Sequence, residues 1–266
     1  MVTKFGWFSR ILLGFFLVLI GAGKGWSQDH ASTGIILLHG KNGMPSGHIA
    51  KLAEALRDKG YVVSTPTMPW AKGAIYSAGY DESLKLINRE VSSLRAKGLK
   101  NIIVAGHSLG AHMALAYAGT DSTLAGVILL APGHYPENAG PKHPSVLNSV
   151  EKAKSLVAEG KIDQTGDFDD VNNGSEISVS AKPADYLSFC DPDGTGTMEH
   201  AVGTFHHSLP VLLISESSPR VDPKETIFDA LPSNDKSRFV QSGASHMDVP
   251  DDSVDTVLNW LKSLSL

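Results

Sequence analysis

The sequence predicts a single α/β domain, built as a mostly parallel, doubly wound sheet with an insertion after its fourth core strand. Three observations predict this fold class. Short, continuously apolar segments recur, as expected of strands buried on both faces. Amphipathic segments with helical periodicity separate them, and such alternation builds parallel sheets with helices on both faces. The alternation breaks off after Pro132 and resumes at Val211.

The first half of the chain alternates strand and helix without interruption. Residues 34–39 read Gly-Ile-Ile-Leu-Leu-His and are apolar up to their last residue. The amphipathic segment that follows ends at Gly60, and a second one ends at Gly98, because glycine is a frequent helix stop. The strands expected here are 34–39, 61–65, 101–105 and 124–130, and the helices are 48–59, 81–97 and 109–118.

The second half begins with the insertion, residues 133–208. It contains one expected helix, about 145–159, and then a polar stretch from Asp163 to Gly174 that is rich in Asp and Asn. We expect this stretch to be a solvated loop, since its carboxylate spacing does not match a calcium-binding loop. Beyond the insertion, strands are expected at 211–214 and 238–240, and a final helix at about 253–264.

The composition is that of a globular protein and excludes several classes of function. Of 266 residues, 42% are hydrophobic and 19% are charged, which excludes a wholly disordered chain. The net charge of -5 argues against nucleic acid as a partner. The single cysteine, Cys190, excludes an internal disulfide framework and a cysteine-based zinc site, and we expect it to be a small buried side chain.

The N-terminus has the pattern of a secretory signal peptide. Lys4 and Arg10 precede an apolar run at 11–20, and small residues follow it up to Ser27. The run is shorter than the roughly 20 apolar residues that span a bilayer. We therefore expect residues 1–27 to be removed and residues 28–266 to form a secreted or periplasmic domain without stable membrane insertion. An uncleaved N-terminal anchor is the alternative.

One motif stands at a strand-to-helix corner. Gly106-His107-Ser108-Leu109-Gly110 follows the third expected strand and precedes a helix. A serine in such a corner sits on a strained turn, and the flanking glycines let the strand and the helix approach closely. Its hydroxyl then lies at a helix N-terminus, where the dipole and free amide groups favour negative charge. The corner therefore indicates a nucleophilic serine.

With this motif in place, the chain resembles the α/β-hydrolase superfamily over about residues 33–266. The resemblance rests on His39-Gly40 after the first strand, on the pentapeptide 106–110 and on Ser245-His246-Met247-Asp248 after the last strand. The insertion at 133–208 corresponds to the family's cap or lid. The resemblance implies that Ser108 is the nucleophile and His246 the general base, roles that suit a weakly nucleophilic hydroxyl and a near-neutral imidazole.

The same resemblance implies an oxyanion hole made by two backbone N–H groups. One belongs to Leu109, directly after the nucleophile, and the other to Lys41 in the loop after the first strand. The Lys41 side chain is able to reach an anionic substrate, but we expect it to be solvated, as most lysines are.

The triad acid is where this chain departs from the family pattern. The usual aspartate position, after the strand ending at Ile214, is aligned with Ser218. Glu216 is close enough to substitute, and Asp222 can do so if the loop folds back. We favour Glu216 slightly, because Asp222 precedes Pro223 and such a pair commonly caps a helix. The remaining possibility is that no acid is present.

These features predict a serine hydrolase, most simply an esterase or lipase-like enzyme that acts on a small-molecule ester or a related acyl substrate. No cofactor and no metal are expected. Two alternatives remain: a weakly catalytic or non-catalytic small-ligand binding or sensor protein, motivated by Ser218, and a non-acyl reaction such as C–C bond hydrolysis with the same residues.

Cleavage of the expected signal peptide gives a defined product. The mature protein should begin near Gln28, because small residues occupy the two positions that a signal peptidase reads, Gly25 and Ser27. Mass spectrometry of the exported protein measures this start. Recovery of a chain that still carries Met1 would instead favour the anchor.

Overall fold

The computed structural model describes residues 1–3, 30–140 and 142–266. Apart from residues 1–3, the expected signal peptide 1–27 lies outside the described residues. A short 3₁₀ turn, η1 (His30–Ser32), leads into the first strand. None of the helices in the described ranges is long and apolar enough to cross a bilayer.

A six-stranded sheet forms the centre of the domain, and all of its neighbouring strands pair in parallel. The order across the sheet is β2-β1-β3-β4-β7-β8. The strands are β1 (Thr33–Leu38), β2 (Val62–Ser64), β3 (Asn101–His107), β4 (Gly126–Leu130), β7 (Val211–Ser215) and β8 (Arg238–Gln241). The predicted parallel, doubly wound α/β fold is therefore confirmed.

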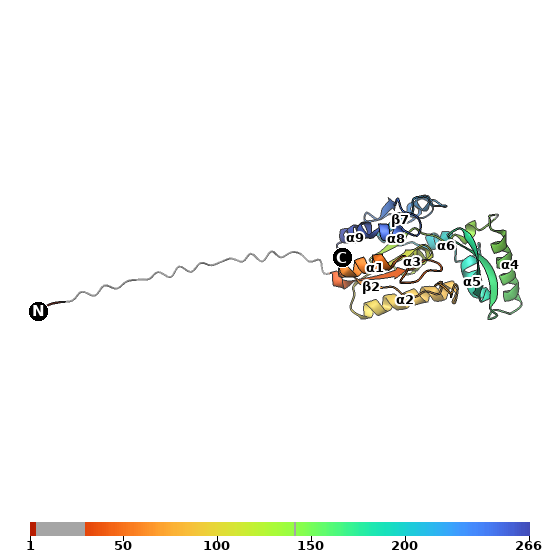
Figure 1. Ribbon diagram of the computed structural model, residues 1–266, viewed down its shortest axis with the longest axis horizontal. Coiled ribbons are helices and arrows are strands. Elements are labelled where there is room, and N and C mark those ends of the chain that lie inside the picture. Colours follow the sequence, from red (N-terminus) through yellow and green to blue (C-terminus); the bar gives the residue numbers. More distant parts are fainter. Residues whose placement is uncertain (4–29, 141) are drawn as a thin grey trace.

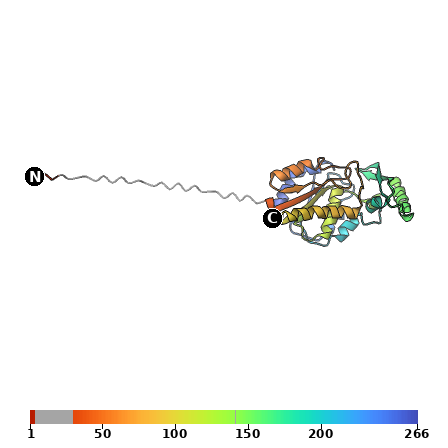
Figure 2. The same ribbon diagram turned by 90° about the horizontal axis from the view of Figure 1, so that it is seen from below.

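Helices cover both faces of this sheet (Figures 1 and 2). Ile35 and Leu37 of β1 share a core with α1 and α9, whereas Ile36 and Leu38 face the core formed with α2 and α3. The four central strands are buried on both faces, which explains their continuous hydrophobicity. The helices are α1 (Ala50–Asp58), α2 (Tyr80–Ala96), α3 (Leu109–Thr120), α8 (Val249–Asp252) and α9 (Val254–Ser263).

The insertion forms a cap beyond one end of the sheet, where Figure 1 shows α4 and α5. It contains more regular structure than the sequence predicted. A 3₁₀ turn, η2 (Pro136–Asn138), precedes its elements, which are α4 (Pro144–Ala158), β5 (Gly166–Asn172), β6 (Ser175–Ala181), α5 (Pro183–Cys190) and α6 (Met198–Thr204). After β7 come the short α7 (Pro223–Thr226) and the 3₁₀ turn η3 (Phe228–Ala230).

The prediction of a solvated loop at 163–174 is wrong, because most of it is a strand of an antiparallel hairpin. Asn173 and Gly174 turn the hairpin with φ values of 48° and 79°. Asn-Gly is the pair that best tolerates two such residues in a tight turn. One face of the hairpin is buried against α4 and α5, so Phe168 and Asp170, two residues apart, both lie inside.

Aromatic side chains join the cap to the sheet domain. Tyr76, from the loop before α2, stacks on Phe189 of α5 with ring centroids 4.7 Å apart. Phe168 of β5 stacks on Tyr186 of α5 at 4.6 Å. Cys190, at the end of α5, is buried beside them, as expected for a small apolar side chain. This packing makes the base of the cap continuous with the core.

Candidate active site

Ser108 occupies a sharp corner between β3 and α3. Its backbone has φ 56° and ψ -121°, a conformation that costs a non-glycine residue free energy. A Cβ on Gly106 would lie 2.1 Å from the carbonyl oxygen of Gly110, so only glycine permits this approach. The Ser108 N–H donates to Leu130 O at 3.0 Å, and the Gly133 N–H donates to Ser108 O at 3.3 Å. Neighbouring loops therefore hold the strained corner in place.

His246 and Glu216 meet Ser108 from two other loops. The Ser108 hydroxyl lies 3.0 Å from Nε2 of His246, and Nδ1 of His246 is hydrogen-bonded to the carboxylate of Glu216. Glu216 directly follows β7 and His246 follows β8. The Ser217 N–H donates to Ala244 O at 2.9 Å, which ties these two loops together. The three side chains thus form one hydrogen-bonded row.

The other candidate acid, Asp222, and the aligned position, Ser218, lie elsewhere. The Asp222 carboxylate accepts from the Lys224 N–H at 2.8 Å and caps α7, the local role that its sequence context suggested. Ser218 is exposed. Among the described residues, the carboxylate bonded to His246 is that of Glu216.

Both backbone N–H groups expected in an oxyanion hole lie beside this row. Leu109 is the first residue of α3, where the N–H has no partner within the helix. Gly40 packs against Ser108, because a Cβ there would lie 3.1 Å from Ser108 Cβ, and Lys41 follows it. Within the described parts of the chain, neither the Lys41 N–H nor the Leu109 N–H donates a hydrogen bond.

His107 supports the loop that carries His246. Its Nε2–H donates to the backbone carbonyl of His246 at 2.8 Å, and the two rings lie 5.0 Å apart. Burial, with the neighbouring His246 as a smaller cause, lowers the pKa of His107 to about 3. The ring is therefore neutral in ordinary buffers and positions the His246 loop without adding charge.

A cavity of about 390 Å³ opens onto Ser108 and His246. Its apolar side chains are those of Met44, Ile49 and Met247. Asn172 and Asn173 at the tip of the cap hairpin also line it. The remaining residues along its wall are His39, Gly40, Lys41, Asn42, Gly43, Gly47, His48, Lys72 and His107. Most of the side chains on the wall are thus polar by type, but apolar atoms form a large part of its surface, and among the described residues none is a carboxylate.

The expectation that the Lys41 side chain is solvated is wrong. Its Nζ donates to Asp170 of the cap at 2.7 Å, and the two side chains are only 6% and 7% exposed. Neither Asp170 nor the asparagines at the hairpin tip was singled out from the sequence. A signal was present, because Asn173-Gly174 is followed by alternating apolar residues at 177, 179 and 181, the pattern of a hairpin.

Two further histidines, His39 and His112, serve structural contacts. His39 Nε2 accepts from the Met68 N–H at 3.1 Å, and its Nδ1–H donates to Gly40 O at 2.9 Å, which shapes the loop after β1. His112 is buried beside the Tyr80 hydroxyl, and burial lowers its pKa to about 4. In the described ranges, no three His, Cys, Asp or Glu side chains are grouped to hold a metal.

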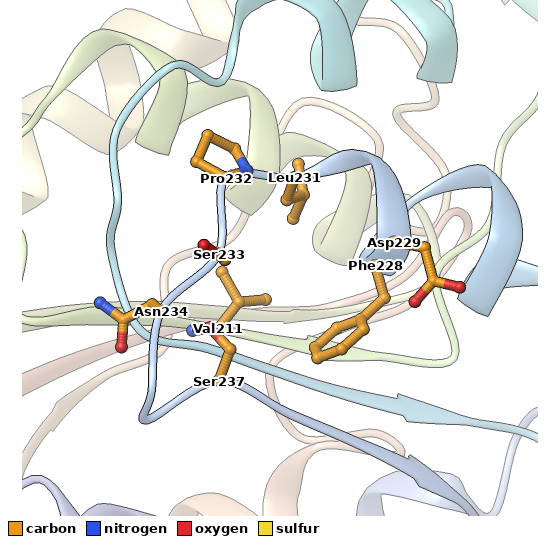
Figure 3. Close-up of a pocket in the computed structure, with 8 residues that line it drawn as sticks. All are labelled: Val211, Phe228, Asp229, Leu231, Pro232, Ser233, Asn234 and Ser237. Atoms are coloured by element: carbon orange, nitrogen blue, oxygen red, sulfur yellow. Dashed lines mark hydrogen bonds between the residues drawn. The ribbon is translucent and has the colours of Figure 1, made fainter.

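A second cavity, of about 310 Å³, lies away from this chemistry. Figure 3 shows Phe228, Leu231 and Pro232 around it, with Val211 at its base. Val211 begins β7, whereas Glu216 follows the other end of the same strand. Ser237 Oγ, on its wall, accepts from the Val211 N–H at 3.0 Å. The cavity that the hydrogen-bonded row reaches is therefore the one at Ser108 and His246.

Comparison with known proteins agrees with the fold. The sequence profile of the Alpha/beta hydrolase family matches residues 35–257. The chain therefore belongs to the α/β-hydrolase family, and this membership supports a hydrolase activity. No protein with curated function matches it significantly.

Solved structures of lipases and an esterase share this fold. A monoacylglycerol lipase of Paleococcus ferrophilus has 22% identity and a TM-score of 0.63, over 87% of this chain and 94% of that one. A soluble variant of monoglyceride lipase from Saccharomyces cerevisiae has 17% identity and a TM-score of 0.63, over 88% of this chain and 87% of that one. Est1E from Butyrivibrio proteoclasticus, with bound ferulic acid, has 16% identity and a TM-score of 0.56, over 86% of this chain and 90% of that one.

The buried neutral state of His107 makes stability depend on pH. Between pH 6.5 and 3 the unfolded chain binds a proton at this ring that the folded chain does not. The stabilisation of the folded state that depends on neutral His107 is therefore fully present above pH 6.5 and is lost as pH falls. His107→Gln should therefore reduce the slope of the unfolding free energy against pH by up to about 1.4 kcal/mol per pH unit. Urea unfolding of both proteins from pH 7 to 4 measures this, and parallel curves would contradict it.

Proposed function

We propose that this protein is a serine hydrolase that cleaves small carboxylic esters through an acyl-enzyme on Ser108. The observation that carries the proposal is the row in which Ser108 Oγ lies 3.0 Å from His246 Nε2 while Glu216 holds Nδ1 of the same ring. A serine hydroxyl becomes an effective nucleophile when a base at hydrogen-bond distance takes its proton. A carboxylate behind that base fixes its tautomer and stabilises the imidazolium that forms.

The reaction follows from this order of groups. Ser108 Oγ attacks the ester carbonyl carbon while its proton passes to Nε2 of His246. The resulting oxyanion accepts hydrogen bonds from the free N–H groups of Lys41 and Leu109, and the N-terminal dipole of α3 adds to their effect. The C–O bond then breaks, and His246 returns the proton to the departing alcohol. A water molecule, deprotonated by His246, attacks the acyl carbon. The bond to Ser108 Oγ then breaks, and His246 returns the proton to that oxygen as the acid is released.

The reason for considering a binding or sensor protein no longer applies. It rested on Ser218 at the usual acid position, and the carboxylate of Glu216 stands at His246 instead. Nothing in the geometry favours a non-acyl reaction over acyl transfer.

Two substitutions test the proposed roles. Ser108→Ala should abolish labelling by a fluorophosphonate probe and turnover of p-nitrophenyl acetate. Glu216→Gln should lower kcat about a hundred- to ten-thousand-fold, because an amide can donate to Nδ1 and favour the wrong tautomer of His246. Steady-state kinetics and gel-based labelling measure both effects.

Asp222→Asn is the matched control, since it makes the same carboxylate-to-amide change where asparagine still caps α7. Its kcat should stay within about twofold of wild type, as for most surface substitutions. A folded wild type that neither labels nor turns over would refute the hydrolase. An Asp222→Asn enzyme as impaired as Glu216→Gln would reassign the acid.

The small number of wholly apolar side chains in the cavity favours short acyl chains. These side chains are Met44, Ile49 and Met247. A methylene group gains about 0.8 kcal/mol only when it is buried against apolar surface. A long acyl chain soon extends past these three side chains, whereas the asparagines at the hairpin tip can donate to polar substituents.

An acyl-chain series tests this substrate range. We expect p-nitrophenyl acetate and butyrate to have kcat/KM at least about tenfold above the dodecanoate, because the longer chain must extend past the three apolar side chains of the cavity. Assays below the critical micelle concentration, with Ser108→Ala as the blank, measure the series. A steady rise of kcat/KM with chain length would contradict it.

We also propose that the enzyme is exported. The charged start, the apolar run 11–20 and the small residues up to Ser27 support this, and the measured start of the mature chain decides it.

A further inference from the structure

A buried cluster of polar groups links the loop after β1 to the cap. Lys41 Nζ donates to Asp170 Oδ2 at 2.7 Å and to the carbonyl of Val171 at 2.9 Å. The Tyr76 hydroxyl donates to the same Asp170 oxygen at 2.8 Å. The Tyr76 ring lies 5.6 Å from the Lys41 ammonium. The Lys41 and Asp170 side chains are almost wholly removed from solvent.

The Asp170 carboxylate is fixed independently of Lys41. Its other oxygen accepts from the Val171 N–H at 2.7 Å, and strand pairing with β6 holds the backbone of β5. Tyr76 is fully buried and stacked on Phe189. The carboxylate is therefore a rigid acceptor. Lys41 must meet it there, because an unpaired ammonium in this interior would lose both its hydration and its counter-charge.

The loop on which Lys41 lies is otherwise held on either side of that residue. The Trp70 indole N–H donates to His39 O at 2.7 Å, and the Asn42 N–H donates to Trp70 O at 2.9 Å. The Gly40–Lys41 peptide lies between these anchors, and its carbonyl, Gly40 O, accepts from the Gly43 N–H at 3.0 Å and from the His39 Nδ1–H at 2.9 Å. The side chain of Lys41 adds a further restraint on this residue, from the cap.

We propose that Asp170 is a positioning residue for the oxyanion hole, acting from the cap through the Lys41 ammonium. The inference rests on the proposed function, in which the Lys41 N–H binds the oxyanion. Donors to an oxyanion accelerate acyl transfer only if they are aimed before the charge develops. The cap thus has a part in the chemical step in addition to roofing the cavity.

Two near-isosteric substitutions test the pair. Asp170→Asn and Lys41→Met should each lower kcat for p-nitrophenyl acetate and the rate of phosphonylation by fluorophosphonate at least about tenfold, because both reactions develop charge at the same oxygen. KM should change less than about threefold, since ground-state binding does not use the oxyanion. The double variant should be no slower than the worse single variant, because both changes break one interaction.

Two further variants separate positioning from folding. Lys182→Met with Asp163→Asn removes another lysine–aspartate pair of the cap, which joins at 2.8 Å but is 49% and 79% exposed, and both rates should stay at wild-type values. Tyr76→Phe keeps the stacked ring and removes one hydrogen bond to Asp170, so a smaller loss in the same two rates is expected. Thermal unfolding followed by circular dichroism shows which variants are folded.

The outcomes separate the two proposals. Parallel losses in kcat and phosphonylation with KM preserved support the positioning role. It is overturned if Asp170→Asn or Lys41→Met keeps both rates within about twofold, or if the loss appears in KM alone. If those two variants do not fold, a fully active Tyr76→Phe overturns it and a proportionate loss in both rates supports it. Wild type that is neither labelled nor active overturns the proposed function, and this inference with it.

Discussion

The left-handed backbone at Ser108 is the constraint on which the arrangement of the site depends. The chain must leave β3 and begin α3 within one residue. This sharp turn is held because the surrounding loops pack within van der Waals distance of it. Backbone atoms of other residues occupy the space where a Cβ on Gly106 or on Gly110 would lie. A Cβ on Gly133 would stand 3.0 Å from the Ser108 hydroxyl. The turn lifts that hydroxyl above the carboxyl edge of the sheet, where ligands bind in open parallel sheets.

The rest of the site is assembled at the same edge from loops far apart in sequence. The loop after β1 brings Lys41, the loop after β7 brings Glu216 and the loop after β8 brings His246. Parallel strands direct all of these loops to one edge, so side chains separated by more than a hundred residues meet without long excursions. The cap hairpin then reaches this edge through Asp170 and the asparagines at its tip.

The sequence predicts most of this architecture because burial on both faces makes the central strands apolar throughout. The corner at Ser108 and the histidine after the last strand are predicted by local pattern and resemblance. The carboxylate beside His246 is only weakly indicated, because the slight preference for Glu216 over Asp222 depends on the path of a loop tied to its neighbour at Ser217 and Ala244. The hairpin in the cap is missed because clustered aspartates suggest solvent. Asp170 is buried only because its partner, Lys41, comes from 129 residues away.

The buried thiol of Cys190 bears on how the molecule can be handled. It is 2% exposed between Tyr76 and Tyr186, and burial raises its pKa far above the usual range for a thiol, so very little thiolate is available to reagents. It is also the one cysteine in the chain. A cysteine placed on the outer surface of the cap would therefore be the single reactive handle. A fluorophore or spin label attached there would report cap movement from a defined position, with the native thiol left in place.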